Sequence, residues 1–384
     1  MKLGADILFE RELLRGRTIG LVCNPASVNA DLAPVAEIAE RHGVRLGALF
    51  GPQHGFRSDL QENMIESPHE KDASRRVPIY SLYSETRQPT PAMLDGLDAL
   101  VVDLQDVGTR IYTYIYTMAG CLRAAAAAGL PVVVCDRPNP INGVAVEGPM
   151  LDVAYASFVG EYPIPMRHGM TIGELAKLFN EHFGIGAKLE VVTMQGWTRA
   201  QWFDETGLTW VLPSPNIPTL DSAIVYPGTV LFEGTNVSEG RGTTRPFEII
   251  GAPWIDPEPF AAALNARGLP GVYFRPTRFE PTFHKHAGTP CGGVQIHVRD
   301  RDAFRAVETG LVLVDACRRA DPTAFAWRDP PYEYEAIKWP FDILAGSDRE
   351  RLGISRGTDA RDIASSWMAE IEAFRRVRQA FLMY

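Results

Sequence analysis

The sequence lacks the features that define several classes of protein. Its 384 residues contain no run of the roughly 20 apolar residues that a membrane-spanning helix needs, because the longest candidate, residues 122–135, is interrupted by Arg123, Gly129 and Pro131. The five cysteines are scattered and never spaced as CxxC, which argues against a zinc site and a disulfide framework. No apolar signal-peptide region follows Met1, so we expect a cytoplasmic protein, although a leader removed beforehand would leave the same picture.

Basic charge is also scarce. The chain has a formal net charge of -9 and an isoelectric point near 5.5, so we expect no nucleic-acid partner, because such binding depends mainly on clustered lysine and arginine. Neither GxGxxG after the first predicted strand nor GxxxxGK(S/T) occurs, which removes the main support for nucleotide binding. With 46% hydrophobic and 22% charged residues, the composition is that of a globular protein, for which no membrane partner is expected.

The first two hundred residues alternate between short apolar runs and helical patterns. Runs such as residues 99–102 are apolar on both faces, as strands of a parallel sheet covered on both sides must be. The expected strands are residues 18–24, 45–50, 77–82, 99–104, 131–135 and 189–194, and the expected helices are residues 6–15, 31–42, 91–97 and 112–128. The alternation predicts an α/β fold with a Rossmann-like, doubly wound and mostly parallel sheet.

The composition and the periodicity of the sequence change near residue 211. Residues 211–251 are rich in Pro, Gly, Thr and Asn and show little periodicity. Helices are expected near residues 259–267, 301–318 and 363–381, and strands near 272–279 and 294–298. We therefore predict a Rossmann-like domain over residues 1–210 and a smaller α+β domain over residues 211–384.

Polar, turn-rich loops follow the expected strands, and ligands of open parallel sheets bind outside these carboxyl ends. The first such loop contains Asn24, and the second contains Gln53, His54 and Arg57, which we interpret as sugar-binding residues. A tight turn with a structural histidine is the alternative interpretation of the second loop.

The loop after residue 102 carries two aspartates and an arginine. We interpret Asp106 as catalytic or sugar-binding and Arg110 as substrate-binding, while a helix N-cap is the alternative for one of the carboxylates. Tyr112, the first of three closely spaced tyrosines, offers an aromatic face and a hydroxyl to a sugar, although at least one of the three is expected to serve packing.

Two further loops carry candidate ligands of a substrate. Asp136, Arg137 and Asn139 stand in a backbone fixed by prolines, which preorganises hydrogen-bonding groups, although an ion pair that only anchors the loop would look the same. His168 is available for a ligand. Thr171 and Glu174, which follow it, form a capping box, so Glu174 is expected to be structural.

The densest polar segments of the chain are residues 213–219 and 233–244. A long irregular loop inside a compact domain is usually functional or disordered, and the apolar flanks of residues 233–244 argue that this segment is held in place. We therefore interpret Asn216, Asn236 and Arg241 as substrate-binding and Glu239 as catalytic.

These same segments resemble the exo-β-N-acetylmuramidase family, formerly a domain of unknown function, over nearly the whole chain. The most specific matches are residues 103–114 (DLQDVGTRIYTY), 136–140 (DRPNP) and 238–244 (SEGRGTT). The resemblance implies exo-acting hydrolysis of the β-glycosidic bond beyond a terminal N-acetylmuramic acid, with peptidoglycan-derived disaccharides or glycan ends as partners. It implies a site between two domains, with no metal and no organic cofactor.

One position departs from the family pattern. Relatives often read Pro-Glu-His-Gly where this chain has Gln53, and an amide cannot donate a proton as a carboxylic acid does. Replacements for that carboxylate are sought among Glu62, Glu66, Glu233 and Glu239. The departure also leaves open a muramic-acid-binding protein without catalysis, or a hydrolase of a related amino-sugar glycoside.

Our mechanistic hypothesis from the sequence assigns Glu239 as the general acid and Asp106 as the carboxylate that supports the oxocarbenium-like centre. The sugar's own acetamido oxygen is a possible nucleophile. Gln53 and His54 would then hold the acetamido group or ring hydroxyls, and Arg110 or Arg241 would pair with the lactyl carboxylate.

Overall fold

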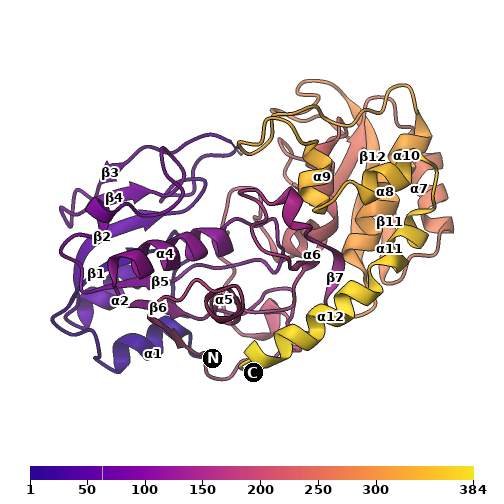
Figure 1. The fold of residues 1–384 in the computed structure, drawn as a ribbon. Helices are drawn as coiled ribbons and strands as arrows, with labels where there is room; N and C mark the ends of the chain where they lie inside the picture. Colours follow the sequence, from indigo (N-terminus) through magenta and orange to yellow (C-terminus); the bar gives the residue numbers. More distant parts are fainter. Residues whose placement is uncertain (63) are drawn as a thin grey trace.

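The computed structural model describes residues 1–62 and 64–384 and contains a seven-stranded sheet in its N-terminal half (Figure 1). The strand order is β3-β4-β2-β1-β5-β6-β9, and all neighbouring pairs are parallel except β3 with β4. The strands are β1 (Thr18–Val22), β2 (Arg45–Gly51), β3 (Glu70–Lys71), β4 (Pro78–Ser81), β5 (Ala99–Val102), β6 (Val132–Cys135) and β9 (Leu189–Val192).

Helices cover both faces of this sheet. One face packs against α1 (Gly4–Glu10) and α2 (Val35–Arg41), and the apolar cluster between them includes Leu21, Val101 and Val133. The other face packs against α4 (Tyr114–Ala128) and α5 (Ile172–Lys177), with α3 (Pro91–Leu94) beside α4. Alternate residues of one strand, such as Val101 and Val102, belong to opposite clusters, as period-2 strand geometry requires. The predicted doubly wound, mostly parallel sheet is confirmed, and all six predicted strands are found, four of them (β1, β4, β5 and β9) with shorter carboxyl ends.

The C-terminal half contains a three-stranded antiparallel sheet of order β10-β12-β11. Its strands are β10 (Ile249–Ala252), β11 (Val272–Phe279) and β12 (Cys291–Val298). The helices of this half are α6 (Leu220–Thr229), α7 (Pro257–Ala266), α8 (Ala306–Ala320), α9 (Pro340–Ala345), α10 (Arg349–Ser355), α11 (Ala360–Ser366) and α12 (Met368–Arg378). The smaller α+β domain expected from the sequence is therefore present.

Two sequence expectations for this half were wrong. Residues 211–251 are not irregular throughout, because they contain α6 with Pro227 inside it, a 3₁₀ helix at Val230–Gly234, and β10. The small residues there serve close packing: a Cβ at Gly228 would lie 2.0 Å from the carbonyl oxygen of Ala306 on the neighbouring α8. The last expected helix is divided at Trp367 into α11 and α12.

The two halves are joined by more than the chain between them. A small antiparallel pair, β7 (Glu147–Met150) with β8 (Pro165–Arg167), lies between the sheets, and one apolar cluster runs continuously from α4 to α8. Helix α12 brings the C-terminus back to the N-terminal domain, so that the two termini lie side by side (Figure 1). Within the described residues, no helix combines the length and the apolar character that crossing a bilayer requires.

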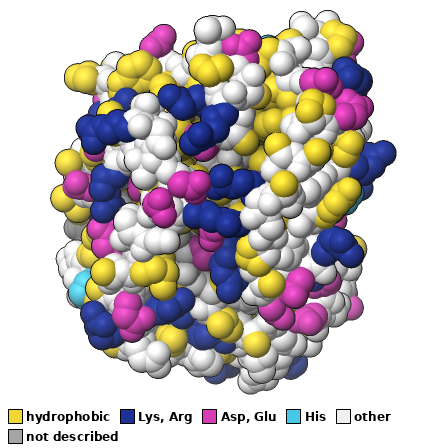
Figure 2. Space-filling view, turned by 90° about the vertical axis from the view of Figure 1, so that its right-hand side faces the viewer, with side chains coloured by type: hydrophobic (Ala, Val, Ile, Leu, Met, Phe, Trp, Pro, Cys, Tyr) yellow, Lys and Arg dark blue, Asp and Glu magenta, His cyan; other side chains and the backbone are white. Residues whose placement is uncertain are grey.

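The outer face of the C-terminal domain carries charges of both signs. Figure 2 shows basic side chains interspersed with acidic ones and with apolar atoms on this face. Several of these charges are paired, for example Arg267 with Asp359 at 2.8 Å and Arg349 with Glu370 at 2.9 Å. Exposed pairs of this kind contribute about 0–1 kcal/mol each.

Candidate functional site

A polar pocket lies where loops of the two halves meet. It encloses about 450 Å³ of space between side chains, part of it at the open mouth. Its walls come from both predicted domains. The polar and aromatic lining residues are Gln53, His54, Tyr112, Thr113, Tyr114, Ser214, Asn216, Tyr226, Glu233, Arg241, Phe247, Tyr332 and Glu333.

Each wall follows from a local feature of the chain. Strand β2 ends at Gly51, where a Cβ would lie 2.7 Å from the backbone of Phe56, so the chain doubles back closely and presents residues 53 and 54. Thr113 directly precedes α4. Glu233 lies in the 3₁₀ helix that continues α6. The last wall is residues 329–338, a segment that reaches from the C-terminal domain to the N-terminal one (Figure 1).

A chain of hydrogen bonds connects Gln53 to a buried glutamate. The hydroxyl of Thr113 donates to Gln53 Oε1 over 2.8 Å, and Gln53 Nε2 donates to Glu333 Oε1 over 3.2 Å. Tyr83 donates its hydroxyl to Glu333 Oε2 over 2.8 Å. Glu333 is only 2% exposed, and burial together with the nearby Glu233 raises its pKa to about 7.

A second carboxylate of the pocket is ion-paired. Arg241 Nη2 donates to Glu233 Oε1 over 2.6 Å, and Tyr332 donates its hydroxyl to Glu233 Oε2 over 2.6 Å. The other terminal nitrogen of the guanidinium, Nη1, is buried and has no hydrogen-bond partner among the described residues. The Arg241 guanidinium also lies over the ring of Phe247, 5.2 Å from its centroid. The pocket therefore contains a positive group with unused donor capacity.

His54 is held as a neutral ring. Burial lowers its pKa to about 4, and its Nδ1 lies 2.8 Å from the carbonyl oxygen of Leu60. A carbonyl only accepts, so Nδ1 carries the proton and Nε2 is left as an acceptor. The sequence prediction that residues 53 and 54 face one pocket agrees with this geometry.

Glu239 does not have the surroundings of a general acid. Lys285 Nζ lies 2.7 Å from Oε2, while His284 Nδ1 and Arg241 Nε lie 3.3 Å from Oε1. These charges lower its pKa to about 2 against the effect of burial, so the carboxylate stays ionised and has no proton to give at neutral pH. It is fully buried and does not line the pocket. The assignment of Glu239 as the acid is therefore withdrawn.

Asp106 is buried and is not among the residues that line the pocket. Its Oδ2 accepts the backbone N–H of Gly108 over 2.8 Å and lies 3.3 Å from Nε2 of the equally buried His168. Its Oδ1 is buried without a hydrogen-bond partner in the described part of the chain. His168 does not line the pocket either, whereas Tyr112, which follows Asp106 along the chain, does.

Three residues predicted to bind substrate are buried and form hydrogen bonds within the protein instead. Arg110 is fully buried and donates to the carbonyl oxygens of residues 149, 164, 344 and 345, which connects the two halves. Arg137 donates through Nε and Nη2 to both oxygens of Asp103, over 2.6 and 2.7 Å. Asn139 donates to the carbonyl oxygen of Met170 over 2.9 Å. None of the three lines the pocket, so the structure does not bring them to a substrate.

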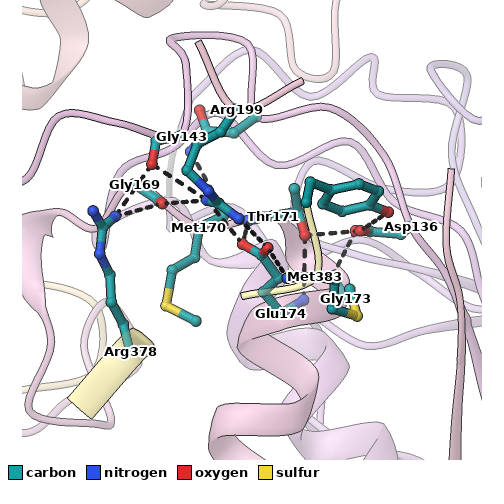
Figure 3. A network of polar contacts seen from close by, with 12 residues as sticks. Asp136, Gly143, Gly169, Met170, Thr171, Gly173, Glu174, Arg199, Arg378 and Met383 are labelled. Atoms are coloured by element: carbon teal, nitrogen blue, oxygen red, sulfur yellow. Dashed lines mark hydrogen bonds and ion pairs between the residues drawn. The ribbon is translucent and has the colours of Figure 1, made fainter. Parts of the chain in front are cut away.

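Asp136 belongs to a network that holds the C-terminus (Figure 3). Its Oδ2 accepts the hydroxyls of Thr171 and Tyr384 over 2.8 and 2.6 Å, and its Oδ1 accepts the N–H of Gly173 over 2.7 Å. The predicted capping box of Thr171 and Glu174 is present at the start of α5. Asp136 therefore stabilises the start of this helix and the C-terminal residue.

The remaining predicted residues divide between the pocket and other positions. Asn216 lines the pocket and donates to the carbonyl oxygen of Gln61 over 2.6 Å. Asn24 donates to the carbonyl oxygen of Pro213 over 2.8 Å, which braces the neighbouring wall. Asn236 binds the backbone of residues 324 and 326. Arg57 is exposed and lies 3.4 Å from Glu70.

Sequence reasoning missed the segment that supplies Tyr332 and Glu333. Its signal was present, because two glutamates alternate with two tyrosines directly after Pro330 and Pro331. Such a polar and aromatic run, stiffened by prolines and lacking helical or strand periodicity, is typical of a functional loop. Tyr83, the other partner of Glu333, lies just beyond β4 and carries no local signal of its own.

The fold and the site define a two-domain α/β protein with a polar pocket between the domains. Models of the exo-β-N-acetylmuramidase NamZ family match residues 19–221 (N-terminal domain) and 224–384 (C-terminal domain). The chain belongs to this family. It is 49% identical over 384 residues to the peptidoglycan β-N-acetylmuramidase NamZ of Bacillus subtilis (strain 168), covering 99% of this chain and 91% of that protein.

Two solved structures share the fold. A DUF1343 family protein from Bacteroides fragilis NCTC 9343 superposes with a TM-score of 0.90 at 35% identity, and a second one from the same strain with a TM-score of 0.79 at 28% identity. Each match covers 100% of this chain and 98% of the other. The arrangement of both domains is therefore common to these relatives.

Proposed function

We propose that this protein is an exo-β-N-acetylmuramidase, a glycosidase that removes N-acetylmuramic acid from the non-reducing ends of peptidoglycan fragments. The observation that carries the proposal is the pocket between the domains, which combines Glu333, hydrogen-bonded to neutral partners, with the Glu233–Arg241 ion pair. Glycoside hydrolysis needs a carboxylic acid that holds a proton and a second group that supports the positive charge at C1. The family and the 49% identical relative support the same activity.

Arg241 is proposed to recognise the lactyl carboxylate, the group that distinguishes N-acetylmuramic acid from N-acetylglucosamine. Its buried Nη1 has donor capacity that no described residue uses. A charge-assisted bond to a carboxylate would satisfy this group, whereas a sugar without the lactyl ether would leave it unpaired. His54 Nε2 and the amide of Gln53 are proposed to bind the acetamido group or a ring hydroxyl, and Tyr112 to contact the ring.

The pocket is bounded by two segments that come from different halves of the chain. Residues 329–338 and the loop after β2 meet here through the contacts of Glu333 with Gln53 and with Met64 Sδ. We propose that these two segments separate when substrate enters.

The direct test is hydrolysis by the wild-type chain of 4-nitrophenyl β-N-acetylmuramide and of the disaccharide in which N-acetylmuramic acid is β-linked to N-acetylglucosamine. Release of N-acetylmuramic acid from both supports the proposal. A chain that cleaves another amino-sugar glycoside but neither muramide contradicts the substrate assignment. A chain that binds the disaccharide in calorimetry without cleaving it is a sugar-binding protein.

A cytoplasmic location is proposed on separate grounds. All five cysteines are free and buried, and burial raises the thiol pKa of each of them. Free thiols are usual in a reducing compartment. Fractionation of cells that produce the protein would test this, and recovery outside the cytoplasm would contradict it.

A further inference from the structure

The pocket holds two glutamates with opposite electrostatic surroundings. Glu233 is ion-paired with Arg241 at 2.6 Å. Glu333 has neutral partners, the amide of Gln53 and the hydroxyl of Tyr83, and among the described residues no lysine or arginine nitrogen lies within 4 Å of its carboxylate. A carboxyl group with neutral partners beside another that is held by a cation is a usual arrangement for acid and base roles in one site.

Because residue 53 is a glutamine, Glu333 has no second carboxyl group beside it at that position. Its amide orientation is set from one side, because Thr113 donates to Oε1, and this leaves Nε2 to donate to Glu333. A glutamate at position 53 would place a second carboxylate about 3 Å from Glu333, and two such groups share one proton. With an amide in that place, the proton belongs to Glu333 alone.

We propose that Glu333 is the proton donor to the glycosidic oxygen in this chain and takes the role that Gln53 cannot fill. The proposal rests on the exo-β-N-acetylmuramidase function proposed above. Gln53 and Tyr83 are positioning residues that hold the carboxyl group at the pocket wall. A pKa of about 7, raised by burial and by Glu233, keeps a large fraction of Glu333 protonated at neutral pH.

Hydrolysis of the glycosidic bond needs no reactant other than the substrate and water. The bond between C1 of the muramic acid and the bridging oxygen breaks, and its electron pair stays on the oxygen, which takes the proton of Glu333. Water supplies hydroxide to C1 and returns its second proton to the Glu333 carboxylate.

The test compares two leaving groups in Glu333→Gln. The disaccharide leaves as a sugar alkoxide that needs a proton, whereas 2,4-dinitrophenolate leaves readily without one. We expect kcat/KM of the variant to fall about 10²–10⁴-fold on the disaccharide and less than about tenfold on 2,4-dinitrophenyl β-N-acetylmuramide. Equal losses on both substrates, or no loss on the disaccharide, would overturn the assignment.

Glu335→Gln is the matched control, two residues away, with a carboxylate that lies 3.5 Å from Lys338 and accepts the backbone N–H groups of residues 337 and 338. It should retain wild-type kinetics on both substrates. A wild-type chain inactive on both muramides would contradict the proposed function itself. Wild-type activity with equal losses in Glu333→Gln would contradict only the role of Glu333.

Tyr83→Phe provides a second test if Glu333→Gln fails to fold. The Tyr83 hydroxyl donates to the ionised carboxylate and so lowers the pKa of Glu333. Its removal should shift the fall in disaccharide kcat/KM, expected near pH 7 in the wild type, to higher pH. An unshifted profile, or a wild-type profile without this fall, would overturn the proposal.

Discussion

Arg241 and Glu233 form a 2.6 Å ion pair in the pocket wall. A second guanidinium nitrogen of Arg241, Nη1, is buried and has no hydrogen-bond partner among the residues that the structure describes. The carboxylate of Glu233 is bound by a cation, whereas the guanidinium of Arg241 still has an N–H group that could donate to an anionic substrate. The protein thus presents one positive and one protonatable group to the same ligand, and this predicts how it distinguishes sugars.

Arg241→Gln should reduce discrimination between muramides and glucosaminides. A charge-assisted hydrogen bond to a carboxylate contributes about 1.5–3 kcal/mol, so we expect kcat/KM for 4-nitrophenyl β-N-acetylmuramide to fall roughly 10–100-fold. The rate on the matching N-acetylglucosaminide should change much less. Arg275→Gln, on the exposed side of β11, is the control and should behave as wild type. Equal losses on both glycosides would contradict lactyl recognition by Arg241.

Glu239→Gln should affect stability more than proton transfer. The variant leaves Lys285 without its buried counter-charge, which costs about 3–5 kcal/mol when one partner of a buried pair is removed, while Arg241 keeps its pair with Glu233. Urea unfolding followed by tryptophan fluorescence measures this loss. The pH dependence of disaccharide hydrolysis should remain that of the wild type, and a lost high-pH fall would restore Glu239 as the acid.

Arg137→Met and Arg57→Met compare a buried with an exposed ion pair. Arg137 is 4% exposed and holds Asp103 through two short bonds, so its loss should lower the free energy of unfolding by about 3–5 kcal/mol. Arg57 pairs with Glu70 in solvent, and its loss should cost about 0–1 kcal/mol. If both variants lose equal stability and only Arg137→Met weakens disaccharide binding, Arg137 is a substrate ligand after all.

His54 should make the protein less stable as the pH falls. Its folded pKa of about 4 is below the unfolded value of 6.5, so the unfolded chain binds more protons between these values. The contribution of the neutral ring is therefore complete above pH 6.5 and is lost as the pH falls toward 4. Because the ring is half-buried, we expect about 1 kcal/mol of extra acid destabilisation relative to His54→Gln. Parallel unfolding curves for both proteins from pH 7 to pH 4.5 would contradict this.

Tyr384→Phe tests the attachment of the C-terminus. The Tyr384 hydroxyl donates to Asp136 over 2.6 Å and accepts the N–H of Met194 over 2.8 Å. Its loss should cost about 1–3 kcal/mol, because two buried polar groups lose a partner. Hydrogen exchange should rise at Met194 and in α12. Tyr334→Phe, whose hydroxyl contacts Glu66 at the surface, should change stability by less than about 0.5 kcal/mol.

The fold class, six of the seven strands of the large sheet and part of the pocket could be predicted from the sequence. Apolar runs of four residues reveal buried strands, and the loops after them hold polar groups because parallel strands end at one edge. Gln53, His54 and Tyr112 were predicted from such loops, Asn216 and Arg241 were predicted from two dense polar segments, and all five line the pocket.

Which charged residues line the pocket depends on tertiary contacts. Asp103–Arg137 and Glu233–Arg241 are both pairs of an acidic and a basic residue from polar loops. The first pair is buried away from the pocket and holds two loops together, whereas both residues of the second pair line the pocket. The difference depends on what surrounds each charge, and those neighbours come from distant segments: Glu333 meets Gln53 across 280 positions. Burial and neighbouring charges set proton affinity, so only the folded chain could separate the ionised Glu239 from the protonatable Glu333.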